Sequence, residues 1–316
     1  MPTPSAAAMP PQLWTSAVVI SLALLGLAVG RLSGRLVPLF GPARPDARTA
    51  ANTHSSGLGS SGRDGPAAAL PGPGGCDAVC DREDDDEGPP PPRCPHCRAE
   101  LVFLRRLPAV AARAFHRRGT CPHCEQAVRS HPAVSAITAL LFAAVGLAAV
   151  RQPEWDVFGT LACLWLAAVG AVLSVVDVRV MRLPDAVVAP SYPVAALLLA
   201  GSVLLPPGGP DPGRGADALV AMVLVTLLYW LLWRVQPGGL GFGDVKLSGL
   251  TGLYAGWAAG PVGALVSVFW AFAAFSAVGL VLLALRRLTR RDPFPLGPFM
   301  LAATLATVLA GQPLLP

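Results

Sequence analysis

Long apolar runs alternate with short polar loops over most of this chain. Each run approaches the roughly 20 residues that a helix needs to cross the hydrocarbon core of a membrane. The pattern predicts eight such segments: Leu13–Val29, Val134–Val150, Val157–Val176, Ala186–Leu205, Ala216–Trp233, Leu247–Ala259, Val262–Leu285 and Phe294–Leu309. The sixth is short and rich in glycine. We therefore predict an all-α, polytopic integral membrane protein with about eight transmembrane helices.

Composition supports this prediction. Hydrophobic residues make up 53% of the chain and charged residues only 14%, which is outside the range of an ordinary soluble domain. The formal net charge is +5. A positive charge of this kind is explained by basic inner loops and by attraction to anionic lipid, so it does not indicate a nucleic-acid partner.

The basic residues also predict an orientation. The first segment has no basic stretch before it and no small-residue cleavage site after it, so we expect an uncleaved helix that starts outside. Alternation of the spans then places most loop arginines and the lysine inside, and leaves only Arg151 and Arg214 outside. The residues expected inside are Arg179, Arg182, Arg234, Lys246, Arg286, Arg287, Arg290 and Arg291.

One long hydrophilic region separates the first and second spans, and it has two parts. Residues 41–92 are rich in Gly, Pro, Ser and Ala and carry the acidic run Asp81–Glu87. Such a composition buries too little apolar surface to offset its ordering entropy, so we expect disorder. The acidic run is expected to be solvated, with contact to a basic partner as the alternative. We assign no role to Cys76 and Cys80.

The second part, residues 93–131, holds two Cys-Pro-His-Cys sequences. Two such knuckles can close a tetrahedral site, for which structural zinc is the common occupant. The expected ligands are Cys94, Cys97, Cys121 and Cys124. The alternative is a redox dithiol or disulfide pair, which a cytoplasmic location disfavours. His96 and His123 could compete as ligands, but four thiolates already complete the shell. We expect a small cytoplasmic zinc module.

Two aspartates stand where apolar segments meet short basic loops. Asp177 ends one segment, and Asp244 closes a glycine-rich string before another. Carboxyls at a membrane boundary are costly and usually mark a functional site. Two carboxyls that lie close together share one proton, which suits a pair in which one acts as base on water and the other as acid. Glycines such as Gly241 and Gly243 would let the backbone approach a substrate.

These motifs resemble those of the type IV prepilin peptidases, a family of GxGD-type membrane aspartyl proteases. The matching strings follow one another in order from Arg93 to the C-terminus. They are the paired Cys-Pro-x-Cys knuckles, Asp177 to Asp185 ending in Leu-Pro-Asp, Gly241-Phe-Gly-Asp-Val-Lys-Leu247, and Pro295-Leu-Gly-Pro-Phe299. The resemblance implies that Asp177 and Asp244 are catalytic. It implies that Gly241, Gly243, Asp185 and Lys246 lie in the substrate-binding region.

The resemblance also implies a substrate, a location and a second activity. The substrates would be prepilins or prepilin-like secretion proteins, whose short basic leader is removed. The protein would lie in the bacterial inner membrane with its active site facing the cytoplasm. Many members also methylate the new N-terminus with S-adenosylmethionine. This chain reads Pro132-Ala-Val-Ser135 where the family often has Pro-x-x-Glu, so that cofactor is expected only if methylation is retained.

Two other hypotheses remain at this stage. A proton- or cation-coupled transporter could use Asp177 and Asp244 as a relay, because such transporters also place carboxylates in broken helices. We find no internal repeat of the kind those transporters often show. A membrane scaffold would leave both aspartates unexplained. Asp185 follows a proline at a predicted helix start, where an acid is favoured for structural reasons alone. We expect four parts in the chain. Residues 1–40 hold the first transmembrane helix, residues 41–92 the disordered insert and residues 93–131 the zinc module. Residues 132–316 form a transmembrane aspartyl peptidase domain.

Overall fold

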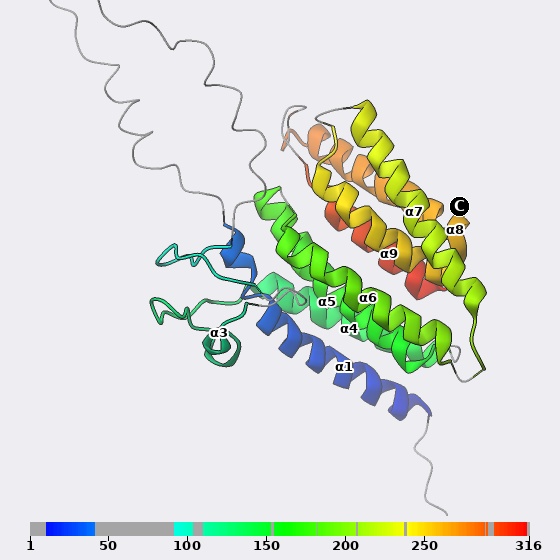
Figure 1. Ribbon diagram of the computed structural model, residues 1–316, viewed down its shortest axis with the longest axis horizontal. Coiled ribbons are helices and arrows are strands. Elements are labelled where there is room, and N and C mark those ends of the chain that lie inside the picture. The colour runs from blue at the N-terminus through cyan, green and yellow to red at the C-terminus, as the bar shows by residue number, and fades with distance from the viewer. Residues whose placement is uncertain are drawn as a thin grey trace, which may run out of the picture. The chain divides into compact units, whose positions relative to one another are not determined.

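The computed structural model describes most of the chain as helices. The described residues are 11–41, 92–103, 110–152, 155–181, 183–206, 208–236, 239–287, 289 and 294–314. In these ranges there is no extended strand, only three isolated bridges. The predicted disordered insert, with Cys76, Cys80 and the acidic run, lies outside the described residues except for its ends, 41 and 92, and so do Arg182, Arg290 and Arg291. The all-helical prediction is confirmed for the part of the chain that the structure describes (Figure 1).

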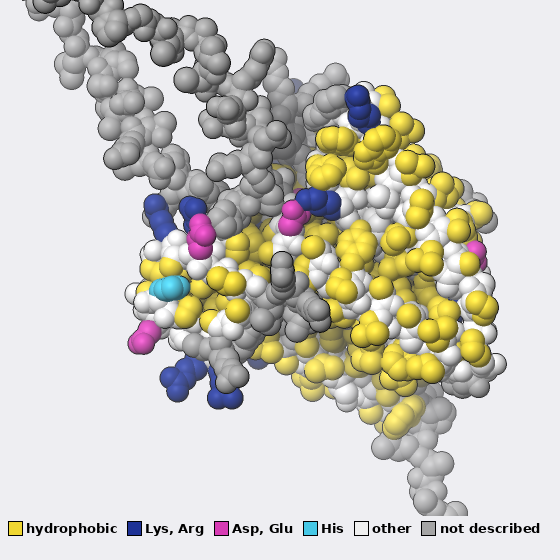
Figure 2. Space-filling model, viewed as in Figure 1, with side chains coloured by type: hydrophobic (Ala, Val, Ile, Leu, Met, Phe, Trp, Pro, Cys, Tyr) yellow, Lys and Arg dark blue, Asp and Glu magenta, His cyan; other side chains and the backbone are white. Residues whose placement is uncertain are grey.

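Among the described residues, seven helices contain at least 14 residues, and together they form the bundle. In chain order the elements are α1 Pro11–Ser33, η1 Val37–Phe40, α3 Arg113–Arg118, α4 Pro132–Arg151, α5 Val157–Val180, α6 Asp185–Leu204, α7 Pro212–Val235, α8 Phe242–Ala284 and α9 Gly297–Ala310. Six of them are long and apolar enough to cross a membrane, and α9 is a shorter apolar helix. Their outer surfaces remain hydrophobic: Leu140 and Leu197 are more than 70% exposed, and hydrophobic side chains cover most of the helical face in Figure 2.

Helix α8 contains two helical segments. At about 1.5 Å per residue, its 43 residues would extend about 64 Å, roughly twice the hydrocarbon thickness. The helical backbone breaks at Ala259 and Gly260, where Gly260 has φ 68° and Pro261 follows. Thr251 and Ser267 line one small cavity although they stand on opposite sides of the break, so the segments fold back on each other. Two apolar segments were predicted here; the total of eight spans stays a prediction.

Glycines bring neighbouring helices into close contact. Gly26 and Gly30 of α1 face α4, where an added Cβ would lie 2.7 Å from the oxygen of Thr138 or the Cα of Ser135. Gly252 of α8 approaches α7 equally closely, with a Cβ position 2.8 Å from the oxygen of Ala221. Small residues of this kind allow membrane helices to pack backbone against backbone. These contacts fix the register of each pair.

Candidate active site and metal site

Asp177 lies in the last turn of α5 and is only 5% exposed. The helix ends at Met181, which adopts a left-handed backbone conformation and donates its N–H to the Asp177 carbonyl. The Asp177 carboxyl reaches the start of α9, where its Oδ2 accepts a hydrogen bond of 3.0 Å from the Gly297 amide. A Cβ at Gly297 would lie 2.7 Å from that oxygen. The bond therefore depends on glycine.

Asp244 lies in the first turn of α8 and is half-buried. Its amide donates a 3.0 Å hydrogen bond to the Gly241 carbonyl, which forms the helix cap. An acidic residue is favoured in this position by the positive end of the helix dipole. A Cβ at Gly241 would lie 3.3 Å from Asp244 Oδ2. The glycines of this string therefore allow the backbone to pass close to the carboxyl.

The two aspartates lie at the same end of the bundle. Gly243 packs against Leu183 in the loop after α5, with its Cβ position 3.0 Å from the Leu183 Cβ. The Asp177 and Asp244 carboxyls are close enough to act on each other electrostatically. Helix α9 contacts both α5 and α8, and its first amide is bonded to Asp177. The structure therefore brings together both carboxyls that the sequence singled out.

Asp185 and Lys246 form an ion pair beside the aspartates. Lys246 Nζ lies 2.6 and 2.8 Å from the two carboxyl oxygens of Asp185, the first residue of α6. The Tyr192 hydroxyl donates to the Lys246 carbonyl at 2.5 Å, and the ammonium lies 5.2 Å from the Phe242 ring centre. Both partners keep more than a third of their side-chain surface exposed. The pair joins α6 to α8, while its expected role in substrate binding stays a prediction.

In the sequence, Gly297 stands out only as part of the Pro295–Phe299 motif, and no role was predicted for it. Its contact with Asp177 joins residues 120 positions apart, and no local pattern specifies such a distant partner. The signal available from the sequence was the position of the glycine between two prolines at the start of an apolar segment. Because glycine has no side chain, a glycine at a helix start indicates that another group can approach its backbone closely.

The four cysteines predicted as ligands converge in the structure. The Sγ atoms of Cys94, Cys97, Cys121 and Cys124 all lie within 4.8 Å of one another. Two of the separations are 3.9 and 3.8 Å, which matches the edge of about 3.8 Å expected for a tetrahedron of sulfurs bound to zinc at about 2.3 Å. They are far too long for a disulfide. The cluster could therefore hold a metal ion.

Each cysteine pair sits in the same local structure. The Cys94 amide donates to the Ala99 carbonyl, and the Cys121 amide donates to the Gln126 carbonyl. The residue after the second cysteine has positive φ in both knuckles, 58° at Arg98 and 57° at Glu125. This repeated turn points the sulfurs of each pair to one side. The two knuckles therefore supply two ligands each.

The thiols differ in how easily they lose their protons. Burial raises the pKa of the Cys94 thiol to about 12. Burial alone would also raise the pKa of Cys121, but the amides of His123 and Cys124 and the neighbouring thiols outweigh it and lower that pKa to about 7. Metal binding requires thiolates. Cys121 would thus ionise more readily than Cys94.

Fold and site together define a class: a multi-pass helical membrane protein with an aspartate pair and a four-cysteine cluster. The chain belongs to the Type IV leader peptidase family, whose pattern it matches over residues 161–284. It is similar to the prepilin leader peptidase/N-methyltransferase of Aeromonas hydrophila, with 33% identity over 72% of this chain and 77% of the relative.

Other relatives carry the same name. The protein of Aeromonas salmonicida strain A449 is 31% identical over 69% of this chain and 71% of its own length. That of Pseudomonas putida is 29% identical over 71% of this chain and 73% of its own length. No solved structure matches the chain. Membership of a peptidase family favours the protease hypothesis over the transporter.

Proposed function

We propose that this protein is a membrane aspartyl endopeptidase that removes the short basic leader of prepilins or prepilin-like secretion proteins. The observation that carries the proposal is the convergence of Asp177 and Asp244. They come from different helices, lie at the same end of the bundle and are within electrostatic reach of each other. The relatives named prepilin leader peptidase support the substrate class.

The chemistry assigned to the pair requires no covalent intermediate. One aspartate, ionised, takes a proton from a water molecule as that water attacks the scissile carbonyl. The other, protonated, donates a hydrogen bond to the carbonyl oxygen, and a proton is delivered to the leaving amine as the peptide bond breaks. The Gly297 amide holds the Asp177 carboxyl in one orientation. Pre-set orientation lowers the entropic cost of bringing base and water together.

Residues around the pair are assigned to substrate binding. Gly241 is exposed beside the Asp244 carboxyl, Gly243 packs against Leu183, and Lys246, two residues after Asp244, is paired with Asp185. Asp185 is partly exposed, and a basic residue of the leader would compete with Lys246 for its carboxylate. The exposed backbone at Gly241 is suited to an extended chain that must pass close to Asp244.

The expected orientation places this end of the bundle at the cytoplasm, in the inner membrane of a bacterium. Arg31, Arg179 and Arg234 occupy the last turns of α1, α5 and α7, on the side of the aspartates. Arg151 and Arg214 belong to the opposite ends. An excess of basic residues on the aspartate side supports the cytoplasmic assignment.

We assign structural zinc to the four-cysteine cluster, where Cys94, Cys97, Cys121 and Cys124 would hold it. A closed four-thiolate shell leaves no position for a reacting water, so the ion would stabilise the fold of residues 93–131. The sulfur separations near 3.8 Å support this ion.

Methyl transfer is not part of the proposal, although the relatives' names include it. Ser135 stands where the family often has glutamate, and it is 7% exposed against α1, with the Gly30 Cβ position 2.7 Å from its Cα. A cofactor role for S-adenosylmethionine would follow only if methylation is retained. Incubation of the cleaved product with labelled cofactor decides that point.

The first experiment compares wild type, Asp177→Asn and Asp244→Asn in detergent at matched amounts of folded protein. The substrate is a peptide with a basic leader that ends in glycine before an apolar segment. Cleavage is expected from wild type, and each variant should lose at least about a thousandfold in rate, because neither general acid–base partner can be replaced. A well-folded, metal-loaded wild type that cleaves no such peptide would remove the proposal.

A further inference from the structure

The packing of α7 against the first segment of α8 places a tyrosine beside Asp244. Glycines of α8 contact α7 at a steady register, with Gly256 against Ala218 and Gly252 against Met222. The helices therefore run antiparallel. Continued towards the start of α8, this register sets Tyr229 opposite Val245, the residue after Asp244. The rings of Trp233 and Phe242, one turn further along, confirm it with centres 5.2 Å apart.

Tyr229 is held rigidly, but its hydroxyl has no hydrogen-bond partner among the described residues. The side chain is 1% exposed, and its ring stacks on Phe272 at 5.6 Å and 23°. The two other tyrosines of the chain donate to carbonyls, Tyr192 to Lys246 and Tyr254 to Ala162. Within the described ranges no group is hydrogen-bonded to the Tyr229 hydroxyl. The Asp244 carboxyl is close enough to act on this hydroxyl electrostatically.

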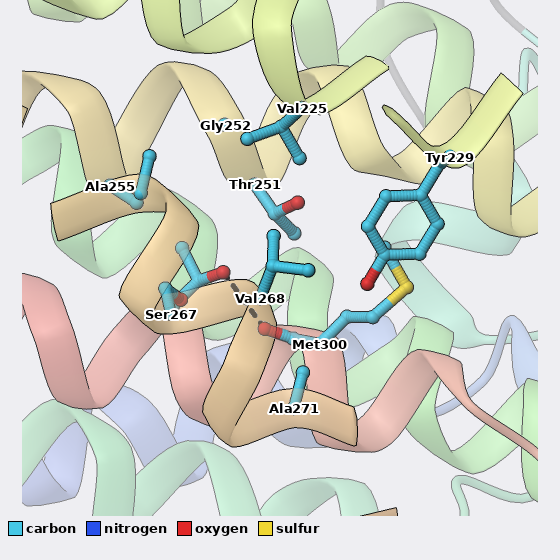
Figure 3. Close-up of a pocket in the computed structure, with 11 residues that line it drawn as sticks. Val225, Tyr229, Thr251, Gly252, Ala255, Ser267, Val268, Ala271 and Met300 are labelled. Carbon is cyan, nitrogen blue, oxygen red and sulfur yellow. Dashed lines mark hydrogen bonds between the residues drawn. The ribbon is translucent and has the colours of Figure 1, made fainter. Parts of the chain in front are cut away.

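A small polar cavity adjoins the same side chain. It is lined from α7, both segments of α8 and α9, and Figure 3 shows Tyr229, Thr251, Ser267 and Met300 around it. The Thr251 and Thr304 hydroxyls donate to carbonyls of their own helices. No described group is bonded to the Ser267 hydroxyl, which is buried at the cavity. Two uncommitted hydroxyls and two further hydroxyl oxygens thus surround one space.

The size and lining of the cavity suit water. Its volume is about 10 Å³, close to the space that the centre of one water molecule needs, and a stable buried water makes two to four hydrogen bonds. A buried hydroxyl left without any partner costs about 1–3 kcal/mol. A water in this cavity would have the Tyr229 and Ser267 hydroxyls among the groups that line its site.

We propose that the cavity holds a water molecule and that the Tyr229 hydroxyl, bonded to that water, positions the Asp244 carboxyl. The inference rests on the proposed function in treating Asp244 as catalytic. Tyr229 is a positioning residue: it links α7, the cavity and the carboxyl, and it limits the orientations that Asp244 adopts. A hydroxyl beside a carboxyl in a low-dielectric bundle interacts more strongly than it would in water.

The test replaces Tyr229 by phenylalanine, which removes the hydroxyl and keeps the ring on Phe272. Tyr254→Phe is the matched control, because Tyr254 is equally buried but donates to Ala162, away from the aspartates. Tyr229→Phe is expected to lower kcat about tenfold with KM unchanged, because the water would lose the hydroxyl that orients Asp244 through it. Tyr254→Phe is expected to leave kcat within about twofold, whatever it does to thermal stability.

A second readout needs no substrate. Infrared difference spectra show a band of the protonated Asp244 carboxyl, which is assigned by its disappearance in Asp244→Asn. This band should shift in Tyr229→Phe and should not shift in Tyr254→Phe. Ser267→Ala should shift the band less, in the same direction, and serves if Tyr229→Phe does not fold. An unchanged band in Tyr229→Phe and Ser267→Ala overturns the inference. If the variants show these shifts but the wild type cleaves no peptide, only the proposed function is overturned.

Discussion

The amide of Gly297 reaches Asp177 because this residue has no side chain. In Gly297→Ala the new methyl group would lie 2.7 Å from Asp177 Oδ2, so either α9 or the carboxyl must move. We expect cleavage to fall at least about tenfold, since small misplacements of a catalytic group have large effects on rate. The measurement is kcat on the leader peptide at matched folded protein.

Gly279→Ala is the control for that substitution. Gly279 lies in the second segment of α8, and no atom lies within 4 Å of its Cβ position. Alanine is favoured over glycine in a helix by about 1 kcal/mol, so activity should stay unchanged and stability should not fall. Equal activity losses in both variants would show that the contact with Asp177 is unimportant.

The two candidate catalytic aspartates could be predicted from the sequence, whereas the residues that contact them could not. Asp177 and Asp244 stand out because a carboxyl at the end of an apolar segment is costly and rarely without purpose. Tyr229 gave no such signal, since an aromatic residue near a span end is commonly an interfacial anchor. Only the register of α7 on α8 places it beside Asp244.

At the scale of a helix, Asp156 caps the start of α5. Its Oδ1 accepts a 2.5 Å hydrogen bond from the Gly159 amide, and α5 carries Asp177 at its other end. Asp156→Ala should lower the free energy of unfolding by about 1 kcal/mol, the usual cost of losing an N-cap. Thermal unfolding in detergent measures this. Asp156→Asn keeps a capping oxygen and should restore most of the loss; equal losses would contradict the capping role.

Helices could be predicted from the sequence where the length and composition of an apolar run were sufficient. The apolar runs located α1 and α4 to α7, and the paired cysteine spacing located both knuckles. The sequence also placed separate apolar segments on either side of residue 260, where a glycine with positive φ and a following proline break α8. It could not specify that Thr251 and Ser267 share a cavity, because that depends on how the two segments pack.

At the scale of the whole molecule, the cysteine cluster is joined to the bundle. The Arg93 amide donates to the Leu39 carbonyl at 3.0 Å, and the rings of Phe40 and Phe103 lie 5.9 Å apart. Metal binding of this type is coupled to folding. Cys94→Ser should therefore reduce the yield of folded protein several-fold while it changes turnover per folded molecule much less.

Metal content by elemental analysis, together with yield, checks this prediction. His96→Ala and His123→Ala are the controls, because these exposed histidines stand in the same knuckles outside the set of four sulfurs. Both should retain metal and normal yield. Normal folding of Cys94→Ser without bound metal would count against a structural role for the ion.

The bond between Gly297 and Asp177 has a consequence for how the protein becomes active as it is made. The two residues are 120 positions apart, so a ribosome has synthesised Asp177, and then Asp244, well before it reaches α9. Until α9 enters the membrane, the carboxyl on α5 lacks the amide that orients it. A nascent chain would thus cleave neighbouring substrates more slowly until the segment containing α9 has been inserted.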